Sequence, residues 1–296
     1  MRLLFFVLLI FSFDVQSKIP EPGYGLPELA SEARIKELNS KKRAKVMTPS
    51  VQRKMQRVLE ALDEAGILEQ EQALLKKEKK DKEAEAKDKE IAKAIANGQR
   101  ELDDLKTRLA SLQSYDRSMY YYYSAYYNLA YQDKISEAMN NYVKLVAEKD
   151  TAEKLRVNAY YVLAQLYLSE SNYESGLDYL LRWFKNTAEV NPDGYVLLGQ
   201  AYYLLADKES TKSKVLASYQ KAYNNMVEAK RLADEKQIRF RENWYSLLLA
   251  SMGELDLKNE QVPVYEEILE LYPKKKYFVN LAGLYNDLDR QRDYTA

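Results

Sequence analysis

The chain has 296 residues, with 45 Lys and Arg against 45 Asp and Glu, and it contains neither cysteine nor histidine. The zero net charge argues against a nucleic-acid-binding protein, because phosphate contacts need clustered Lys and Arg. Without cysteine and histidine the chain lacks thiol nucleophiles, disulfides, and the commonest metal ligand and general base. Zinc enzymes, Ser-His-Asp hydrolases and Cys-His enzymes are therefore excluded. Only 9 Gly and 7 Pro stand among abundant Ala, Leu, Lys, Glu and Tyr, which predicts an all-α protein.

The first residues have the layout of a secretory signal peptide. Arg2 precedes an apolar run over residues 3–13, and Ser17 stands directly before the expected cleavage site. The alternative is an uncleaved membrane anchor, but a spanning helix needs about 20 apolar residues, and Asp14 ends this run too early. We therefore expect residues 1–17 to be removed on export to the periplasm, leaving a mature protein without a membrane span.

Residues 18–48 are expected to form an extended, basic N-terminal segment. Three prolines and two glycines fall within residues 18–30, and they predict a flexible tether. A basic cluster follows at residues 41–43 and at Lys45. It is either a docking site for an anionic partner or a solvated helix face, and the second interpretation is favoured.

Residues 49–114 are expected to be a helical region with a charged insert. Helical periodicity begins at Thr48-Pro49, since proline suits the first position of a helix. Gly66 and the pair Asn97-Gly98 are expected to break helices. Residues 76–93 carry acid-first charge pairs at i,i+4 and almost no apolar stripe, which predicts a solvated helix or a partly disordered spacer. We favour a helical hairpin whose charged part projects into solvent; a dimeric coiled coil is the alternative.

Residues 115–296 repeat a pattern of aromatic, small and aromatic positions. The equivalent positions Tyr126, Ala164, Gly199, Leu248 and Ala282 are separated by 38, 35, 49 and 34 residues. A period near 34 with these residue types predicts a tetratricopeptide-type helical-hairpin solenoid, in which each hairpin buries its apolar faces against its neighbours. We expect four repeats and the first helix of a fifth. Either this last helix has no capping helix or the chain is truncated, and truncation is the favoured interpretation.

A partner-binding groove is expected on the face formed by the first helix of each repeat. In the first repeat four tyrosines at i, i+3, i+7 and i+11, from Tyr120 to Tyr131, share one helix face. Tyr joins a rigid ring to a polar tip, and Asn and Gln can bind a peptide backbone. The alternative is that these tyrosines only pack between helices, since the chain holds 26 of them. The predicted partner-binding residues are Tyr120, Tyr123, Tyr127, Asn158, Tyr161, Gln165, Gln200, Tyr203 and Tyr245.

No arrangement of residues indicates catalysis. The chain has no glycine-rich phosphate-binding motif. The acidic pairs Asp103-Asp104 and Glu266-Glu267 are adjacent on predicted helices, so their side chains diverge. We predict no catalytic residue, no metal and no cofactor; an enzyme is possible only with an unrecognised carboxylate site.

Four segments of the chain resemble the exported tetratricopeptide proteins that are encoded with TonB, ExbB and ExbD in marine and related gammaproteobacteria. They read KKRAKVMTPSVQRKMQRVLEAL, AYYVLAQLYLSESNYESGLDYLLRWF, RENWYSLLLA and LELYPKKKYFVNLAGLYNDL. The resemblance implies a periplasmic accessory of TonB-dependent uptake, for example of iron–siderophore complexes, with TonB-system components as candidate partners. It assigns no groove residue. The alternative function is an envelope assembly or maintenance factor that binds outer-membrane or cell-wall proteins.

Overall fold

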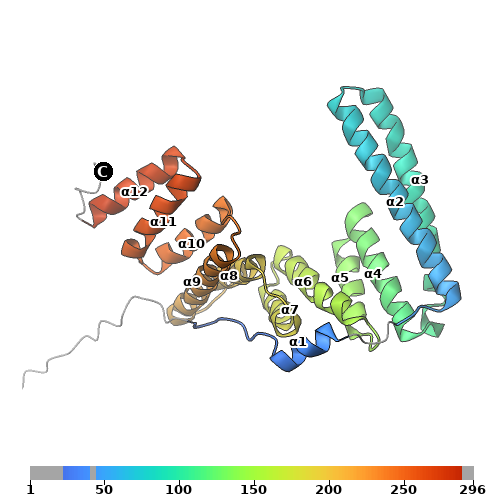
Figure 1. Ribbon diagram of the computed structural model, residues 1–296, viewed down its shortest axis with the longest axis horizontal. Coiled ribbons are helices and arrows are strands. Elements are labelled where there is room, and N and C mark those ends of the chain that lie inside the picture. Colours follow the sequence, from blue (N-terminus) through green and yellow to red (C-terminus); the bar gives the residue numbers. More distant parts are fainter. Residues whose placement is uncertain (1–22, 41–44, 289–296) are drawn as a thin grey trace, which may run out of the picture. The chain divides into compact units, whose positions relative to one another are not determined.

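The computed structural model describes residues 23–40 and 45–288 (Figure 1). These residues form twelve α-helices and one short 3-10 helix, with no β-strand among them. Packing divides the chain into an N-terminal unit, Pro27–Val190, and a C-terminal unit that joins residues from Asn191 onward to the segment ending at Leu26. The predicted signal peptide 1–17 and the basic residues 41–43 lie outside the described residues.

Successive helices pair as antiparallel hairpins, as the sequence predicts. The N-terminal unit holds the hairpins α2–α3, α4–α5 and α6–α7; in the C-terminal unit α8 pairs with α9, and α10, α11 and α12 pack one on the next. The helices of the N-terminal unit are α1 Glu32–Asn39, α2 Pro49–Lys77, α3 Asp81–Thr107, η1 Leu109–Ser111, α4 Ser114–Tyr131, α5 Ile135–Ala147, α6 Glu153–Ser169 and α7 Tyr173–Asn186. Those of the C-terminal unit are α8 Pro192–Ala206, α9 Lys212–Glu235, α10 Glu242–Glu254, α11 Lys258–Leu271 and α12 Lys275–Asp287.

The α2–α3 hairpin consists of two long, unbroken helices. Thr48 is the N-cap of α2 and Pro49 its first residue, as predicted. The prediction that Gly66 and Gly98 break helices is wrong, because both lie inside them. At Gly98 the reason is packing: an added Cβ would overlap Tyr127 Oη of α4 and lie 2.7 Å from Tyr127 Cζ. Glycine is needed at this position for close approach, and its weak helix propensity is outweighed.

The far half of the α2–α3 hairpin is charged outside and lined with small residues inside. Nearly every side chain of residues 76–93 is exposed, and Lys87 of α3 pairs with Glu71 of α2 at 2.8 Å. Across the same interface Gln72 Nε2 donates to the Ala84 carbonyl at 3.1 Å. The alanines that are buried in this hairpin are Ala61, Ala65, Ala84 and Ala94. The favoured prediction of a hairpin with its charged part in solvent is therefore confirmed.

A charged network joins α4, α5 and α6. Arg117 of α4 donates to both carboxylate oxygens of Glu148, at 2.6 and 2.8 Å, and this contact lowers the pKa of Glu148. Arg156 of α6 donates to the carbonyls of Val146 and Glu148 at the end of α5. These carbonyls have no partner inside their own helix. The two arginines thus connect α4 and α6 to the end of α5.

The segment that contains α1 is docked on the α6–α7 hairpin. The Ala30 N–H donates to the Phe184 carbonyl at 3.1 Å. Arg34 of α1 donates to Asn186 Oδ1 at 3.1 Å and to the Glu153 carboxylate at 2.7 Å. A helix of 8 residues is marginal on its own in water, so these contacts stabilise α1.

In the C-terminal unit the start of α10 is tied to α12 by a single carboxylate. Glu242 accepts hydrogen bonds from Lys274 Nζ at 2.6 Å and from Tyr277 Oη at 2.7 Å. The hydrogen bond from Lys274, with that from Tyr277, lowers the pKa of Glu242 to about 2. This contact positions the first helix of the expected fifth repeat against the repeat before it.

Candidate protein-binding surfaces

The predicted groove tyrosines of α4 lie on one helix face, and that face is covered by the α2–α3 hairpin. Tyr120 is 6% exposed and Tyr127 is fully buried; both join one apolar cluster with residues of α2 and α3, and Tyr123 packs against it. Burial raises the pKa of Tyr127 to about 12, and its hydroxyl has no hydrogen-bond partner. The rings of Tyr120 and Tyr127 are therefore core residues in this conformation and are not available to a partner.

The three predicted residues of α6 do share an accessible face. Asn158 and Gln165 are exposed and Tyr161 is half-buried, at helical spacings of three and four residues. The Tyr161 ring lies 5.0 Å from the ring of Trp183 on α7, which fixes its orientation. Polar amides beside a rigid aromatic ring are suited to contact a polypeptide, so this face stays a candidate binding surface.

The predicted residues of the C-terminal unit are divided between surface and core. Gln200 is exposed, and Tyr203 is half-buried with its ring 5.2 Å from that of Tyr219 on α9. Tyr245 is fully buried, its ring lies 4.8 Å from that of Phe240, and burial raises its pKa. Like Tyr127, Tyr245 is packed in the interior and cannot reach a partner without a rearrangement.

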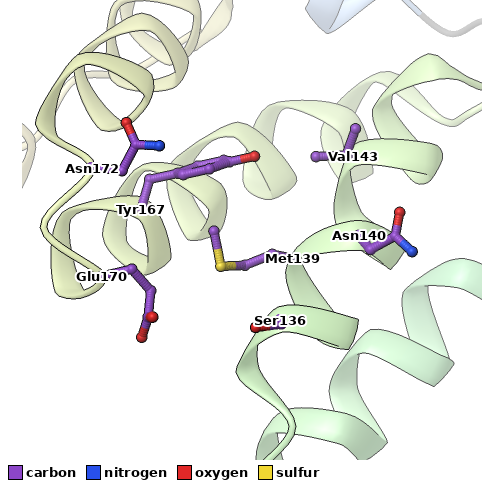
Figure 2. Close-up of a pocket in the computed structure, with 7 residues that line it drawn as sticks. All are labelled: Ser136, Met139, Asn140, Val143, Tyr167, Glu170 and Asn172. Carbon is purple, nitrogen blue, oxygen red and sulfur yellow. The ribbon is translucent and has the colours of Figure 1, made fainter.

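A pocket that was not predicted from the sequence lies between α5 and α6 (Figure 2). It has a volume of about 450 Å³, and we call it the α5–α6 pocket. Figure 2 shows Met139 extending from α5 toward α6, and Tyr167 extending from α6 toward α5. Its lining residues are Ser136, Met139, Asn140 and Val143 of α5, with Tyr167, Glu170 and Asn172.

The aromatic side of the α5–α6 pocket is rigid. The ring of Tyr167 is stacked on that of Tyr179 of α7, with centroids 5.5 Å apart and planes 8° from parallel. The Arg182 guanidinium lies 5.3 Å from the centroid of the Tyr179 ring. Asn172 is the N-cap of α7 and accepts from the Ser175 N–H at 3.2 Å. A surface held in this way loses little conformational entropy on binding.

The chemistry of the α5–α6 pocket is mixed. Met139, Val143 and Tyr167 supply apolar surface, and hydroxyl, amide and carboxylate groups surround it. Apolar anchors within a polar rim are typical of protein-binding surfaces. The single ionised group of the lining, Glu170, favours a ligand that brings hydrogen-bond donors or positive charge.

A signal for this pocket is present in the sequence of α5. The helix carries one apolar line that is buried in the core, at Ala138, Tyr142 and Leu145. A second line runs beside it through Met139 and Val143, four residues apart, and this line is only partly buried. A helix with more apolar residues than its own hairpin can bury indicates a further contact surface.

A second pocket, of about 330 Å³, lies among α3, α4 and α5 and is mostly polar. Tyr120 lines it together with Gln99 and Gln132, whose amides hydrogen-bond to each other at 2.7 Å. Ser124, which is 8% exposed, also lines it, and its Oγ has no hydrogen-bond partner. The neighbouring charges belong to both acids and lysines, so the pocket selects no single charge type.

Three of the four acids in the adjacent pairs contact another helix, and the fourth, Asp103, accepts a hydrogen bond from Gln99 of its own helix at 2.9 Å. Asp104 of α3 lies 3.0 Å from Lys54 of α2, and Glu267 of α11 lies 2.9 Å from Lys230 of α9. Glu266 accepts a hydrogen bond from Tyr285 Oη at 2.6 Å. In the described part of the chain, no cluster of three or more acidic side chains is arranged to hold a metal ion.

Comparison of the chain with protein-family models, curated proteins and solved structures found no match. Across residues 23–40 and 45–288, no helix has both the length and the apolar character for crossing a bilayer. The structure itself establishes an all-helical protein of paired antiparallel helices. Any assignment to a family therefore remains a proposal.

Proposed function

We propose that the chain is a non-enzymatic scaffold of tetratricopeptide type that binds a protein partner in the periplasm. The observation that carries the proposal is the α5–α6 pocket, in which a rigid Tyr167 and the flexible Met139 face each other within a polar rim. Such a pocket accepts the apolar side chains of a helix or of an extended segment. The accessible α6 face of Asn158, Tyr161 and Gln165 adds a second contact surface in the same unit.

The absence of catalysis is part of this proposal. The chain has no histidine or cysteine, and Asp104, Glu266 and Glu267 of the acidic pairs are used in ion pairs and hydrogen bonds between helices. Carboxylates that are already paired with lysine are poor general acids, because the positive charge favours their ionised form. A role in binding is therefore better supported than one in chemistry.

The cellular setting rests on the sequence alone. The layout of residues 1–17 supports export, and the resemblance described above supports a role as an accessory of TonB-dependent uptake across the outer membrane. Components of the TonB machinery are accordingly the first partners to test, and outer-membrane assembly or cell-wall proteins are the second.

The proposal is tested by site-specific photo-crosslinking in iron-starved cells. A photoreactive residue is placed at Asn140, on the rim of the α5–α6 pocket, and separately at Tyr161, on the α6 face. The control position is Lys89, which is exposed on α3 far along the chain from both surfaces. We expect adducts at Asn140 or Tyr161 and none at Lys89, with a TonB-system protein identified by mass spectrometry.

Other outcomes have defined meanings. A porin-assembly or cell-wall protein in the adduct would move the function to envelope maintenance. Equal labelling at all three positions, or none at Asn140 and Tyr161 in a folded and exported protein, would overturn the scaffold proposal. As a second check, Met139→Glu should abolish the adduct at Asn140, whereas Leu216→Glu, at a residue 40% exposed in the C-terminal unit, should preserve it.

A further inference from the structure

A four-residue turn of the chain, Gly23-Tyr24-Gly25-Leu26, is docked on the C-terminal unit. The Leu26 N–H donates to the Gly23 carbonyl at 3.2 Å, and Gly25 has a φ of +79°. A hydrogen bond from the fourth residue to the first, with a positive φ at the third, is the signature of a type II β-turn. The sequence predicts a flexible tether here, whereas the structure shows a turn of defined shape.

Two neighbouring asparagines of α9 bind the backbone of this turn. Asn224 Nδ2 donates to the Tyr24 carbonyl at 2.9 Å, and Asn225 Nδ2 donates to the Gly25 carbonyl at 3.1 Å. With the turn in place, Asn224 is 7% exposed and Asn225 is fully buried. Burying an amide is costly unless it is hydrogen-bonded. Asn225 Nδ2 also donates to the Lys221 carbonyl of α9 at 2.8 Å, and Asn225 Oδ1 is buried without a hydrogen-bond partner. The turn thus supplies two successive carbonyls as acceptors, one for each asparagine amide.

The side-chain contacts of the turn select an aromatic residue followed by glycine. Lys221 Nζ lies 5.5 Å from the centroid of the Tyr24 ring and 5.3 Å from that of the Tyr202 ring. A cation between two aromatic faces is attracted to both. A Cβ added at Gly25 would overlap Lys221 Cγ and lie 2.8 Å from Lys221 Cβ. The backbone at Gly25 thus packs on the stem of Lys221, and a larger residue does not fit.

We propose that Tyr202, Lys221, Asn224 and Asn225 form a peptide-binding site for a glycine–aromatic–glycine turn. Residues 23–26 occupy it within the same chain, and a partner polypeptide that carries the same type of turn is its ligand between chains. The site belongs to the C-terminal unit and does not depend on the α5–α6 pocket or on the proposed function.

The chain's own turn occupies the site, so a partner must displace this turn in order to bind. A tethered segment acts at an effective concentration in the millimolar range. A free peptide with the same contacts therefore binds well only when the tethered turn has been displaced. A variant that releases residues 23–26 should uncover the site without altering any of the four residues that form it.

The test uses the full chain labelled with ¹⁵N and follows the side-chain amide resonances of Asn224 and Asn225. Gly25→Ala is the releasing variant, and the probe is a peptide with blocked ends and the sequence Pro-Gly-Tyr-Gly-Leu-Pro. We expect Gly25→Ala to shift both amide pairs, and the peptide at about 10 mM to return them saturably toward their wild-type positions. The wild-type chain should respond at least about tenfold less to the same peptide, because its site is occupied.

Gly23→Ala is the matched control. Gly23 has the same φ of +79°, but an added Cβ there meets no atom within 4 Å. Both variants carry the same backbone strain, so only Gly25→Ala should release the turn. In the Gly25→Ala background, Asn224→Ala should weaken peptide binding by at least about threefold.

Two results would overturn the proposal. One is that the Asn224 and Asn225 amide resonances have the same positions in Gly25→Ala as in Gly23→Ala. The turn would then not be held by this site. The other is that the released site does not respond to the peptide, or responds equally to a peptide in which Ala replaces Tyr. A circular dichroism spectrum identical to that of the wild type checks that each variant is folded.

Discussion

The hairpins α2–α3 and α6–α7 have the same topology in the same unit, and they differ in the side chains that dominate the interface between their helices. The helices of α2–α3 contain 29 and 27 residues; they share an apolar cluster at the base and meet over alanines and Gly98 beyond it. Those of α6–α7 contain 17 and 14 residues and meet mainly over leucines and stacked aromatic rings, with one close approach at Gly176. Close packing therefore needs either small residues that let two backbones approach or large ones that fill the space between them. The first kind of hairpin should be sensitive to added atoms and the second to lost ones.

The largest effect is expected from Phe184→Ala in the aromatic hairpin. The Phe184 ring is fully buried and lies 4.9 Å from the ring of Trp183. Its removal should lower the free energy of unfolding by about 3–5 kcal/mol, because a large cavity remains. Urea-induced unfolding followed by tryptophan fluorescence measures this. Leu74→Ala on α2, where the side chain is 57% exposed, is the control and should change stability by less than about 0.5 kcal/mol.

Gly98→Ala tests the α2–α3 hairpin by adding atoms to a close contact instead of removing them. The added methyl group would overlap Tyr127 Oη and lie 3.1 Å from the Cβ of Ala61. We expect a loss of about 1–3 kcal/mol in the free energy of unfolding, measured by the same urea titration, because overpacking forces neighbouring side chains to move. Adding Tyr127→Phe removes the hydroxyl and should recover part of this loss. No recovery would mean that the clash lies elsewhere.

Alkaline pH should destabilise the core shared by α4, α5 and α6, which contains Tyr142 of α5. Burial raises the pKa of Tyr142 to about 12, against an ordinary value near 10. Because the pKa of Tyr142 is higher in the folded than in the unfolded state, its protonated hydroxyl contributes fully to the stability of the fold below pH 10. This contribution is lost as the pH rises toward 12. Between pH 9 and pH 11, the free energy of unfolding should therefore fall by about 1 kcal/mol less for Tyr142→Phe than for the wild type. Parallel pH dependences of the two proteins would contradict the burial of this hydroxyl.

The smallest effect is a gain, from Gly66→Ala in α2. Gly66 lies inside the helix, and an added Cβ meets no atom within 4 Å. Alanine is favoured over glycine in a helix, so stability should increase by about 0.5–1 kcal/mol. Thermal unfolding of Gly66→Ala beside Gly98→Ala measures two identical substitutions with opposite expected signs. A shared sign would show that contact with α4 does not distinguish these positions.

The sequence predicts the helices well because their signals are local. The start of α2 at Pro49 and the hairpins of the repeat region follow from periodicity and helix-end residues within one or two turns. Gly98 is a different case. Its role depends on Tyr127, 29 residues further along the chain, and glycine at a helix break has the same appearance in the sequence as glycine at a close contact.

The candidate binding surfaces could be predicted only in part, because distant parts of the chain decide which residues are covered. An aromatic stripe at i, i+3 and i+7 is produced equally by a groove and by a core, and at Tyr120 and Tyr127 the α2–α3 hairpin decides for the core. The α6 face stays a candidate because Asn158, Tyr161 and Gln165 are accessible on one side of the helix. The turn at residues 23–26 was missed because its partners, Asn224 and Asn225, lie about 200 residues away in the chain.

The division of the α2–α3 hairpin into an apolar base and an alanine-lined outer half has a consequence for its length. At 1.5 Å per residue, α2 is a rod of roughly 40 Å, and only its first three turns contribute Val51, Met55 and Val58 to the cluster shared with α4. Beyond them each helix contacts mainly the other. Equal insertions or deletions of seven residues in the outer halves of both helices would keep the facing residues in phase. The length of the α2–α3 hairpin is thus adjustable in steps of about two turns, while α4–α7, which carry the candidate binding surfaces, keep their fold.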